Sequence, residues 1–364
     1  MFRSKAILVS VLVVLAMVLG LALTASLTSA APGQPGVAVK NSPDVTGWTQ
    51  GEGWGPWGPT DEVGAQNGLT QAFVKNQIKN EVKDGKVYDL DPGRYQGMYL
   101  WPGHPPFLNL TYRTPAGERA QGDMAFTDPS VNPSLEYWIS EETMGSQHSG
   151  AHFDSLAHLT TQKYPGKPEG DDYWYNGWNA KTYLGDFGPM KADISTVPPL
   201  VTRGVLLDMY GYFETTGKQD LLKKGYEVTV ADMEAALAWE GVDIEPGDAC
   251  IIRTGLMRWW GDNAKMGEYD GAGPAMDGAN WLIKQKGCVF LGSDASALEM
   301  QPAAPGLSFN PVHILALIEQ GVHIGEMFYL EDLGKDKVYD FLFVVLPNKI
   351  EGGTGSMVRP IAIN

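Results

Sequence analysis

The sequence predicts an α/β fold in which a single domain is built on a mixed, partly parallel central sheet. In the second half of the chain, short apolar runs alternate with helical patterns, which is typical of strands that are connected by helices. These runs are apolar throughout, as expected for strands that are buried on both faces. No internal repeat or low-complexity run divides the chain, so we expect one large domain rather than several.

Five segments of the second half are predicted as strands because each is an apolar run of strand length. Helical patterns separate several of them, and this arrangement favours parallel neighbours in the sheet. The predicted strands are residues 204–209, 249–254, 288–292, 322–330 and 340–346.

Two of the helices between these strands have recognisable starts. The helix predicted over 229–239 begins with Thr229 and Asp232, which have the spacing of a capping box. The helix predicted over 274–285 begins with Pro274, a residue that suits the first helical position.

Residues 1–30 are predicted to be a signal peptide. Arg3 and Lys5 precede an apolar run over 6–23, and small residues ending at Ala30 form a cleavage site. A retained membrane anchor is the alternative, because the apolar run approaches the length that spans a bilayer. In both cases we expect the folded part outside the cytoplasm, either in the periplasm or secreted.

Residues 31–60 are rich in glycine, proline and tryptophan and have no periodic pattern. We therefore expect an extended arm over 31–53, followed by the folded domain over 54–364. The segment 53–58 matches GxGxxG, but no strand precedes it and no helix follows it, so we do not interpret it as a dinucleotide site.

The charge of the chain excludes some classes of partner. It carries 43 acidic and 27 basic residues, and loss of Arg3 and Lys5 with the signal peptide takes the formal net charge from −16 to −18. Such a surface repels nucleic acid and anionic lipid. We expect a small-molecule ligand, no nucleic acid, and no membrane association after signal cleavage.

The two cysteines, Cys250 and Cys288, each lie within a short apolar run. Buried thiols are the default interpretation, and export makes a disulfide possible if the two strands are neighbours. Neither cysteine has a CxxC motif or a paired histidine, so neither is predicted to be catalytic.

The segment 146–158 concentrates imidazole and carboxylate groups: it contains His148, His152, Asp154 and His158. Nitrogen and oxygen donors of this kind suit zinc, manganese or iron. A single histidine in an apolar stretch is usually a hydrogen-bonded core residue, but burial of all four groups with separate partners would be costly. The segment therefore predicts a site for one or two divalent metal ions.

Regular secondary structure cannot bring all four side chains together. A continuous helix would place His148 and His152 on one face and Asp154 and His158 on the other. A continuous strand would separate His148 from His158 by about 33 Å. We expect His152 and Asp154 on one face of a short extended piece, after a bend at 149–150 that Gly150 permits.

A distant helix and strand are predicted to complete the site. Asn310 and Pro311 have the pattern of a helix start, with Phe309 and Ile314 spaced as a hydrophobic staple and Gly321 at the helix end. His313 then lies in the first helical turn.

The chain returns in the strand predicted over 322–330, which carries Glu326. The helix advances about 10 Å and the strand returns about 16 Å, so Glu326 comes back near the level of His313. The alternative is that His313 and Glu326 are simply exposed. His323 and Glu319 are competing candidates, and His323 is less favoured because it faces the other side of the strand.

His148-x3-His152-x-Asp154-x3-His158 resembles the HxGTHxDxPxH motif of the cyclase family of metal-dependent hydrolases, which includes bacterial kynurenine formamidase and isatin hydrolase. The resemblance covers roughly residues 54–350. Ala151 stands where the family usually has Thr, and Leu156 stands where the formamidases have Pro, which makes the chain more similar to the isatin hydrolases here. Further blocks that resemble the family in the same order are 57–65, 101–107, 203–208, 247–248, 252–255 and 292–294.

This resemblance implies a swivelling β/β/α-type domain and a homo-oligomer, a dimer or a tetramer. It implies that His158 is the general acid and base rather than a ligand. It also implies one or two ions of zinc or manganese, with Asp154 bridging them where there are two. The implied ligands are His148, His152 and Asp154 for the first ion, and His313 and Glu326 for the second.

The activity expected from these residues is hydrolysis of a C–N bond in a cyclic amide, cyclic imide or aryl formamide. A divalent ion lowers the pKa of bound water and polarises the carbonyl, and His158 can move the proton near neutral pH. Trp101, His104 and Phe107 are candidate substrate-binding residues, although His104 could equally be structural.

Three alternatives use the same sequence differently. A lactone hydrolase would break a C–O bond at the same site. A non-catalytic exported metal-binding or ligand-binding protein would need neither an open coordination position nor His158. A serine hydrolase is disfavoured because the chain has no GxSxG elbow.

Overall fold

The computed structural model describes residues 57–58, 60–122, 127–164 and 166–364. The predicted signal peptide and the arm over 31–53 lie outside the described residues. The division of the chain into signal, arm and domain therefore stays a prediction.

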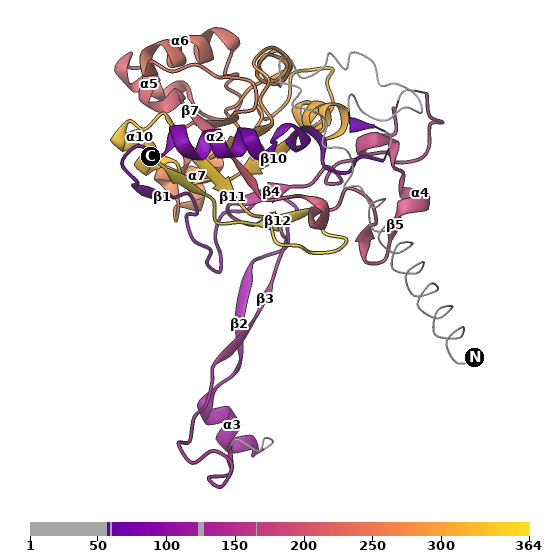
Figure 1. The fold of residues 1–364 in the computed structure, drawn as a ribbon, viewed down its shortest axis with the longest axis vertical. Coiled ribbons are helices and arrows are strands. Elements are labelled where there is room, and N and C mark those ends of the chain that lie inside the picture. The colour runs from indigo at the N-terminus through magenta and orange to yellow at the C-terminus, as the bar shows by residue number, and fades with distance from the viewer. Residues whose placement is uncertain (1–56, 59, 123–126, 165) are drawn as a thin grey trace, which may run out of the picture. The chain divides into compact units, whose positions relative to one another are not determined.

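A nine-stranded mixed sheet forms the centre of the fold (Figure 1). Its four central strands, β7 (Leu200–Asp208), β8 (Ala249–Arg253), β9 (Phe290–Ser293) and β10 (His323–Glu326), are parallel. Antiparallel strands extend the sheet on both sides, so the predicted mixed and partly parallel α/β architecture is confirmed. The outer strands are β1 (Val87–Asp89), β13 (Ile361–Ile363) and β11 (Asp340–Val345) on one side, and β4 (His152–Asp154) and β12 (Gly355–Met357) on the other.

All five predicted strands are present, but their ends differ from the prediction. The strand β7 begins earlier, at Leu200, and β9 begins later, at Phe290. The strand predicted over 322–330 ends at Glu326, because Met327 has a φ of 60° and therefore leaves the extended conformation. The apolar run continues beyond this turn as buried core rather than as strand.

The helix α6 (Val230–Glu240) has the predicted capping box, in which the Thr229 hydroxyl accepts a hydrogen bond from the Asp232 N–H. The helix predicted over 274–285 is α8 (Met276–Asn280), continued by a π-helical turn, η8 (Trp281–Gln285). Since α8 begins at Met276, Pro274 precedes the first helical position instead of occupying it.

The predicted helix after Asn310 consists of α9 (Pro311–His313) and a π-helical segment, η9 (Ile314–Gln320), and it ends at Gly321 in the left-handed region. Asn310 precedes the helix but its side chain makes no capping hydrogen bond, which corrects the prediction. The Glu299 carboxylate accepts hydrogen bonds from the Val312 and His313 N–H groups instead.

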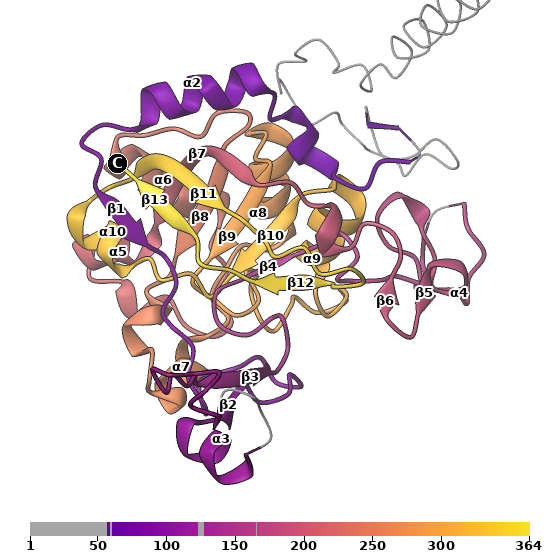
Figure 2. The ribbon, with the colours of Figure 1, turned by 60° about the horizontal axis from the view of Figure 1, so that its bottom comes forward.

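Both faces of the central sheet are buried, which explains why its strands are apolar throughout. In β7, Val205 and Leu207 pack into the core that contains α6 and α5 (Met209–Thr215), and Leu206 packs into the core on the opposite face. Figure 2 shows the central strands with α5, α6, α8 and α9 behind them. On this side of the sheet, η9 also contacts β10.

Smaller elements surround the sheet. The other helices are α4 (Ala180–Tyr183), α7 (Asn263–Tyr269) and α10 (Glu331–Asp336), and β5 (Leu184–Gly185) pairs with β6 (Gly188–Pro189). Short 3-10 turns cover Gly64–Gly68, Tyr175–Gly177, Ile194–Thr196, Gln219–Leu221 and Leu256–Trp259.

A separate antiparallel pair, β2 (Leu108–Arg113) and β3 (Ser140–Met144), projects as a two-stranded ribbon (Figure 1). The helix α3 (Pro115–Gln121) lies between the two strands in the sequence. Most residues of both strands are exposed. The ribbon joins two segments that carry candidate site residues, since His104 precedes β2 and His148 follows β3.

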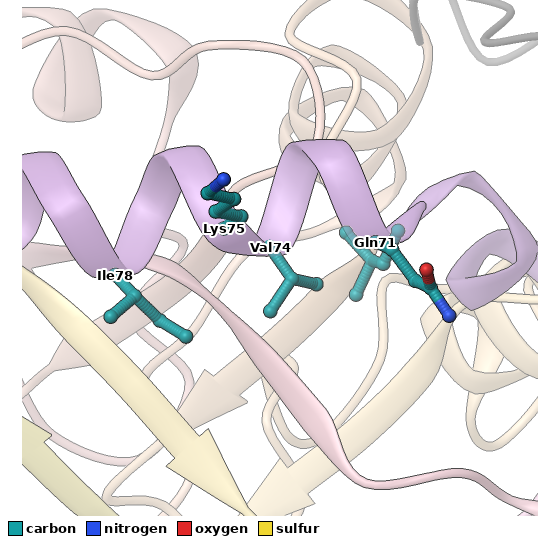
Figure 3. A pocket seen from close by; sticks show the side chains of 5 residues that line it. Gln71, Val74, Lys75 and Ile78 are labelled. Atoms are coloured by element: carbon teal, nitrogen blue, oxygen red, sulfur yellow. The ribbon is translucent and has the colours of Figure 1, made fainter.

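The helix α2 (Gln71–Glu81) lies across the sheet near β7 and β11 (Figure 2). It borders a shallow hollow of about 380 Å³, and Val74 and Ile78 point to the same side of the helix there (Figure 3). The residues that line the hollow include no histidine, cysteine or acidic residue, so it offers no metal ligand. Within the described ranges, no helix is long and apolar enough to cross a membrane.

Candidate metal centre

Five buried side chains from separate parts of the chain converge at one point. His148, His152 and Asp154 form one group, and Asp154, His313 and Glu326 form a second. Within each group, the potential ligand atoms lie within 4.8 Å of one another. The two groups share Asp154, so the structure brings together all five residues that the sequence suggested as ligands. Their role as ligands stays a prediction.

The local conformation of the first group is the one expected from its sequence. Gly150 has a φ of 64°, so the chain bends before the strand β4. His152 and Asp154, at alternate positions of this strand, then lie on the same face. The Nε2 atom of His152 is 3.7 Å from the Asp154 Oδ1 atom.

The pairing of β4 with β10 brings Glu326 to this face. Since His152 lies directly opposite Glu326 in the antiparallel register, their side chains meet. The distance from His152 Nε2 to Glu326 Oε2 is 3.1 Å. The register of the two strands therefore joins the two ligand groups.

His148 approaches from the loop before β4 and is held from both sides of its ring. Its Nδ1 atom lies 2.7 Å from Asp154 Oδ1, and its Nε2 atom lies 3.1 Å from Thr354 Oγ1. Nδ1 is therefore the nitrogen that faces the group, and Thr354 contacts the other ring nitrogen. Gly355 is required beside this ring, because any added Cβ atom would collide with His148.

His313 enters the second group from the first turn of α9. Its Nε2 atom lies 3.3 Å from Glu326 Oε1 and 3.9 Å from Asp154 Oδ2. Its Nδ1 atom lies 2.6 Å from Glu299, whose side chain is buried. Because the Glu299 carboxylate accepts this hydrogen bond, Nε2 is the nitrogen left to face the other two side chains.

The polar atoms of the centre fit divalent metal ions. Among the described residues, Asp154 Oδ2 and Glu326 Oε1 are buried without a hydrogen-bond partner, and such atoms are costly unless a ligand satisfies them. Each of the two groups offers both nitrogen and oxygen donors, the set that zinc and manganese accept.

The electrostatics of the centre favour positive charge. For His152 and His313, burial lowers the pKa, but hydrogen bonds and charge from the neighbouring carboxylates outweigh burial and raise the pKa of both groups. The pKa of Glu326 is lowered despite burial, because the nearby His152 and His313 rings stabilise its anion as ion-pair partners. Two carboxylates in a buried space attract a cation, and a divalent ion supplies that charge more compactly than protons on histidines.

His158 lies beside the five residues rather than among them. Its ring stacks on the His148 ring with a centroid distance of 3.9 Å, and it lies 6.3 Å from the His313 ring. In the described part of the chain, no side chain forms a hydrogen bond or ion pair with this ring. Burial lowers the pKa of His158 to about 3, so the ring is neutral at neutral pH.

The predicted substrate-binding residues differ in how closely they approach the centre. The half-buried His104 ring lies 5.8 Å from the His148 ring, and its Nδ1 atom is buried without a partner among the described residues. Phe107 is buried, and the half-buried Trp101 packs edge to face on the exposed ring of Phe309. His104 therefore faces the centre, and the two aromatic residues belong to the segment around it.

The competing candidates stay outside both groups. His323 is buried on the opposite face of β10, where its ring nitrogens are hydrogen-bonded to the Asp154 and Val63 carbonyls. Glu319 is half-buried in η9 and belongs to neither group. Phe309 contacts Trp101, and its predicted staple with Ile314 stays a prediction. Cys250 and Cys288 are buried free thiols.

Two residues of this centre were missed by sequence reasoning, Glu299 and Thr354. Each holds a histidine ring from a segment without a periodic pattern. A block that resembles the cyclase family ends shortly before Glu299, at Asp294, but spacing alone does not distinguish Glu299 from other acidic residues of the chain.

The fold and the buried centre define an α/β protein with a candidate site for one or two divalent metal ions. The model of the cyclase family, described as "Putative cyclase", matches residues 46–300. This match covers more than half of the chain, so the chain belongs to this family. No curated protein matches the chain.

Solved structures with the same fold have related descriptions. A structure described as a novel cyclase is 27% identical, with a TM-score of 0.70, and the alignment covers 86% of this chain and 97% of that chain. Isatin hydrolase A from Ralstonia solanacearum is 20% identical, with a TM-score of 0.52 and coverage of 76% and 91%. An isatin hydrolase bound to the product analogue thioisatinate is 18% identical, with a TM-score of 0.52 and coverage of 80% and 95%. At these identities, the two isatin hydrolases show a shared fold.

Proposed function

We propose that this protein is a metal-dependent hydrolase that opens a C–N bond in a small cyclic amide, cyclic imide or aryl formamide. The observation that carries the proposal is the buried convergence of His148, His152, Asp154, His313 and Glu326, with His158 stacked beside them. Family membership and the names of the isatin hydrolases of the same fold support the choice of reaction.

The five converging residues would hold one or two ions of zinc or manganese. When bound, a divalent ion acts as a Lewis acid that lowers the pKa of water and polarises a carbonyl group. Asp154 contributes to both groups, and the two oxygens of Glu326 face His152 and His313 separately. These two carboxylates would therefore be shared if two ions bind.

His158 is proposed to move the proton that the reaction releases. Water adds to the carbonyl carbon and the C–N bond breaks, so one proton must pass from the water to the departing nitrogen. The imidazole of His158, which lies beside the centre, would accept that proton and then donate it to the nitrogen. His104, whose ring lies 5.8 Å from the His148 ring, is proposed to contact the substrate.

Two further properties are proposed from the sequence. The N-terminal pattern supports export to the periplasm or outside the cell, and N-terminal sequencing of the mature protein would test it by locating cleavage after Ala30. A homo-oligomer is proposed from the family resemblance, and the native mass in solution tests it. A monomeric mass would contradict that proposal.

Activity and metal content together test the proposed function. Purified protein is analysed for bound metal and assayed on isatin, N-formylkynurenine and simple lactones, before and after chelation and with zinc or manganese added back. The expected result is hydrolysis of a C–N substrate that chelation abolishes and metal restores. Hydrolysis of lactones alone would favour C–O cleavage, whereas metal binding without hydrolysis of any substrate would favour a non-catalytic carrier. Protein that neither contains nor accepts metal would contradict the proposal.

A further inference from the structure

Arg94 connects three segments that meet at the bend before β4. It follows β1 in a loop, and its side chain is only 15% exposed. Its guanidinium Nε donates to the Ser149 carbonyl at 2.8 Å, and its Nη2 donates to the Ala151 and Val358 carbonyls. Its Nη1 is paired with Asp91 at 2.8 Å.

The two carbonyls of the bend that Arg94 binds belong to the residues on either side of Gly150. The rigid, planar guanidinium group of Arg94 therefore holds the peptide groups of the bend from one side. Gly150 also packs directly on this side chain, since a Cβ atom at Gly150 would lie 3.1 Å from Arg94 Cγ and 3.3 Å from its Nε. Contact and hydrogen bonding thus define one conformation of the bend.

That conformation controls the orientation of His152. The Gly150 carbonyl accepts a hydrogen bond from His152 Nδ1 at 2.8 Å. With Nδ1 occupied, Nε2 is directed at Glu326, 3.1 Å away, and at Asp154, 3.7 Å away. A rotated Gly150 peptide would remove the acceptor and free the imidazole to turn.

Arg94 also secures the strand on the other side of β4. The Ala151 carbonyl accepts a second hydrogen bond from the Val358 N–H, immediately after β12. Because Arg94 bonds to both the Ala151 and the Val358 carbonyls, it extends the pairing of β4 with β12 beyond the last paired residues, His152 and Met357. The beginning of β4 is therefore held at the point where the backbone leaves the regular strand.

We propose that Arg94 is a positioning residue that sets the metal affinity of the centre by holding the Gly150 peptide and, through it, the imidazole of His152. The hydrogen bonds of Arg94 go to backbone carbonyls and to Asp91 rather than to the candidate ligand side chains, so its effect is transmitted through the backbone of the bend. This inference rests on the proposed metal-dependent function, and it adds a determinant of affinity that lies outside the five converging residues.

The variants Arg94→Lys and Arg94→Met test the proposal. Lysine keeps the positive charge but lacks the planar guanidinium group. Methionine keeps much of the apolar part of the side chain but has no hydrogen-bond donor. Arg359→Met is the matched control, because Arg359 also pairs with an acidic residue, Asp89 at the end of β1, but its side chain is 73% exposed. Zinc and manganese affinity is measured by competition with a chelator, and folding is checked by circular dichroism and thermal unfolding without metal.

The expected result is a metal affinity roughly 10–100-fold weaker in both Arg94 variants and unchanged in the control. Amide hydrogen exchange at residues 149–152 should be faster in the Arg94 variants than in the wild type, also without metal. A folded Arg94→Met or Arg94→Lys variant with wild-type metal affinity would overturn the proposal. If the wild type itself bound no metal, the proposed function would fail, and unchanged exchange at 149–152 would separately show that Arg94 does not hold the bend.

Discussion

The imidazole rings of His148 and His158 stack with their centroids 3.9 Å apart, although only His148 belongs to a group of potential metal ligands. The two rings therefore have different neighbours. His148 Nδ1 meets Asp154, whereas no side chain in the described part of the chain forms a hydrogen bond or ion pair with the ring of His158. This difference predicts that the two histidines respond differently to substitution.

We expect His158→Ala to retain bound metal but to lose turnover by roughly 100-fold to 10,000-fold, because the proton is no longer transferred by a positioned group. His148→Ala should lose metal as well as turnover. Metal content and steady-state kinetics are measured on the same preparations, with the exposed Thr160→Ala as control. If His158→Ala lost its metal, His158 would be a ligand rather than the acid and base.

The sharing of Asp154 between the two groups predicts the metal stoichiometry. His313→Ala should remove the second ion and leave the first, because His313 belongs only to the second group. Asp154→Asn should weaken the binding of both ions, because a neutral amide replaces an anionic ligand that both groups share. Elemental analysis after equilibration with zinc or manganese measures both effects. A wild type that saturates with a single ion would show that the two groups act as one site.

Glu299→Gln is expected to weaken the binding of the ion at His313 by roughly 10–100-fold. The carboxylate accepts hydrogen bonds from His313 Nδ1 and from two helical N–H groups, and the neutral amide is a poorer acceptor for all three. Affinity is measured by chelator competition, with Glu351→Gln at an exposed position as control. Equal affinities in the Glu299 variant and the wild type would mean that the carboxylate serves only as a helix cap.

The pH dependence of stability is expected to depend on Glu240, at the end of α6. Burial raises its pKa to about 8, and its Oε1 accepts a hydrogen bond from the Asp208 N–H at 2.6 Å. Since the folded pKa exceeds the ordinary value of 4.5, this group stabilises the fold fully below that value, and the contribution is lost as the pH rises towards 8.

Between about pH 5 and pH 9, the free energy of unfolding of Glu240→Gln should therefore fall less than that of the wild type. Glutamine stays neutral over this range, and its side-chain oxygen can still accept the hydrogen bond from the Asp208 N–H. Denaturant unfolding at several pH values measures the difference, and Glu234→Gln, exposed on the same helix, is the control. Parallel curves for the wild type and the Glu240 variant would contradict the assignment.

Local sequence patterns correctly predicted several features of this protein. The continuous apolar runs that became the central strands, the capping box at Thr229 and Asp232, and the bend at Gly150 were all read from residues close together in the chain. Each depends on backbone geometry or periodicity over a few residues, and such information is present in the sequence itself. The position of His152 and Asp154 on one face of a strand is also predictable from residues close together in the chain.

Only the tertiary structure decided which distant residues meet. The antiparallel register of β4 and β10 places Glu326 directly opposite His152. Packing also replaced Asn310 with Glu299 as the cap of α9 and placed Arg94 against the bend before β4. A shift of one residue in the register would turn every side chain of a strand to the other face of the sheet. Short sequence patterns contain no information about that register or about these long-range partners. The sequence by itself therefore determined the chemistry of the donors, and the packing of the sheet determined how they converge.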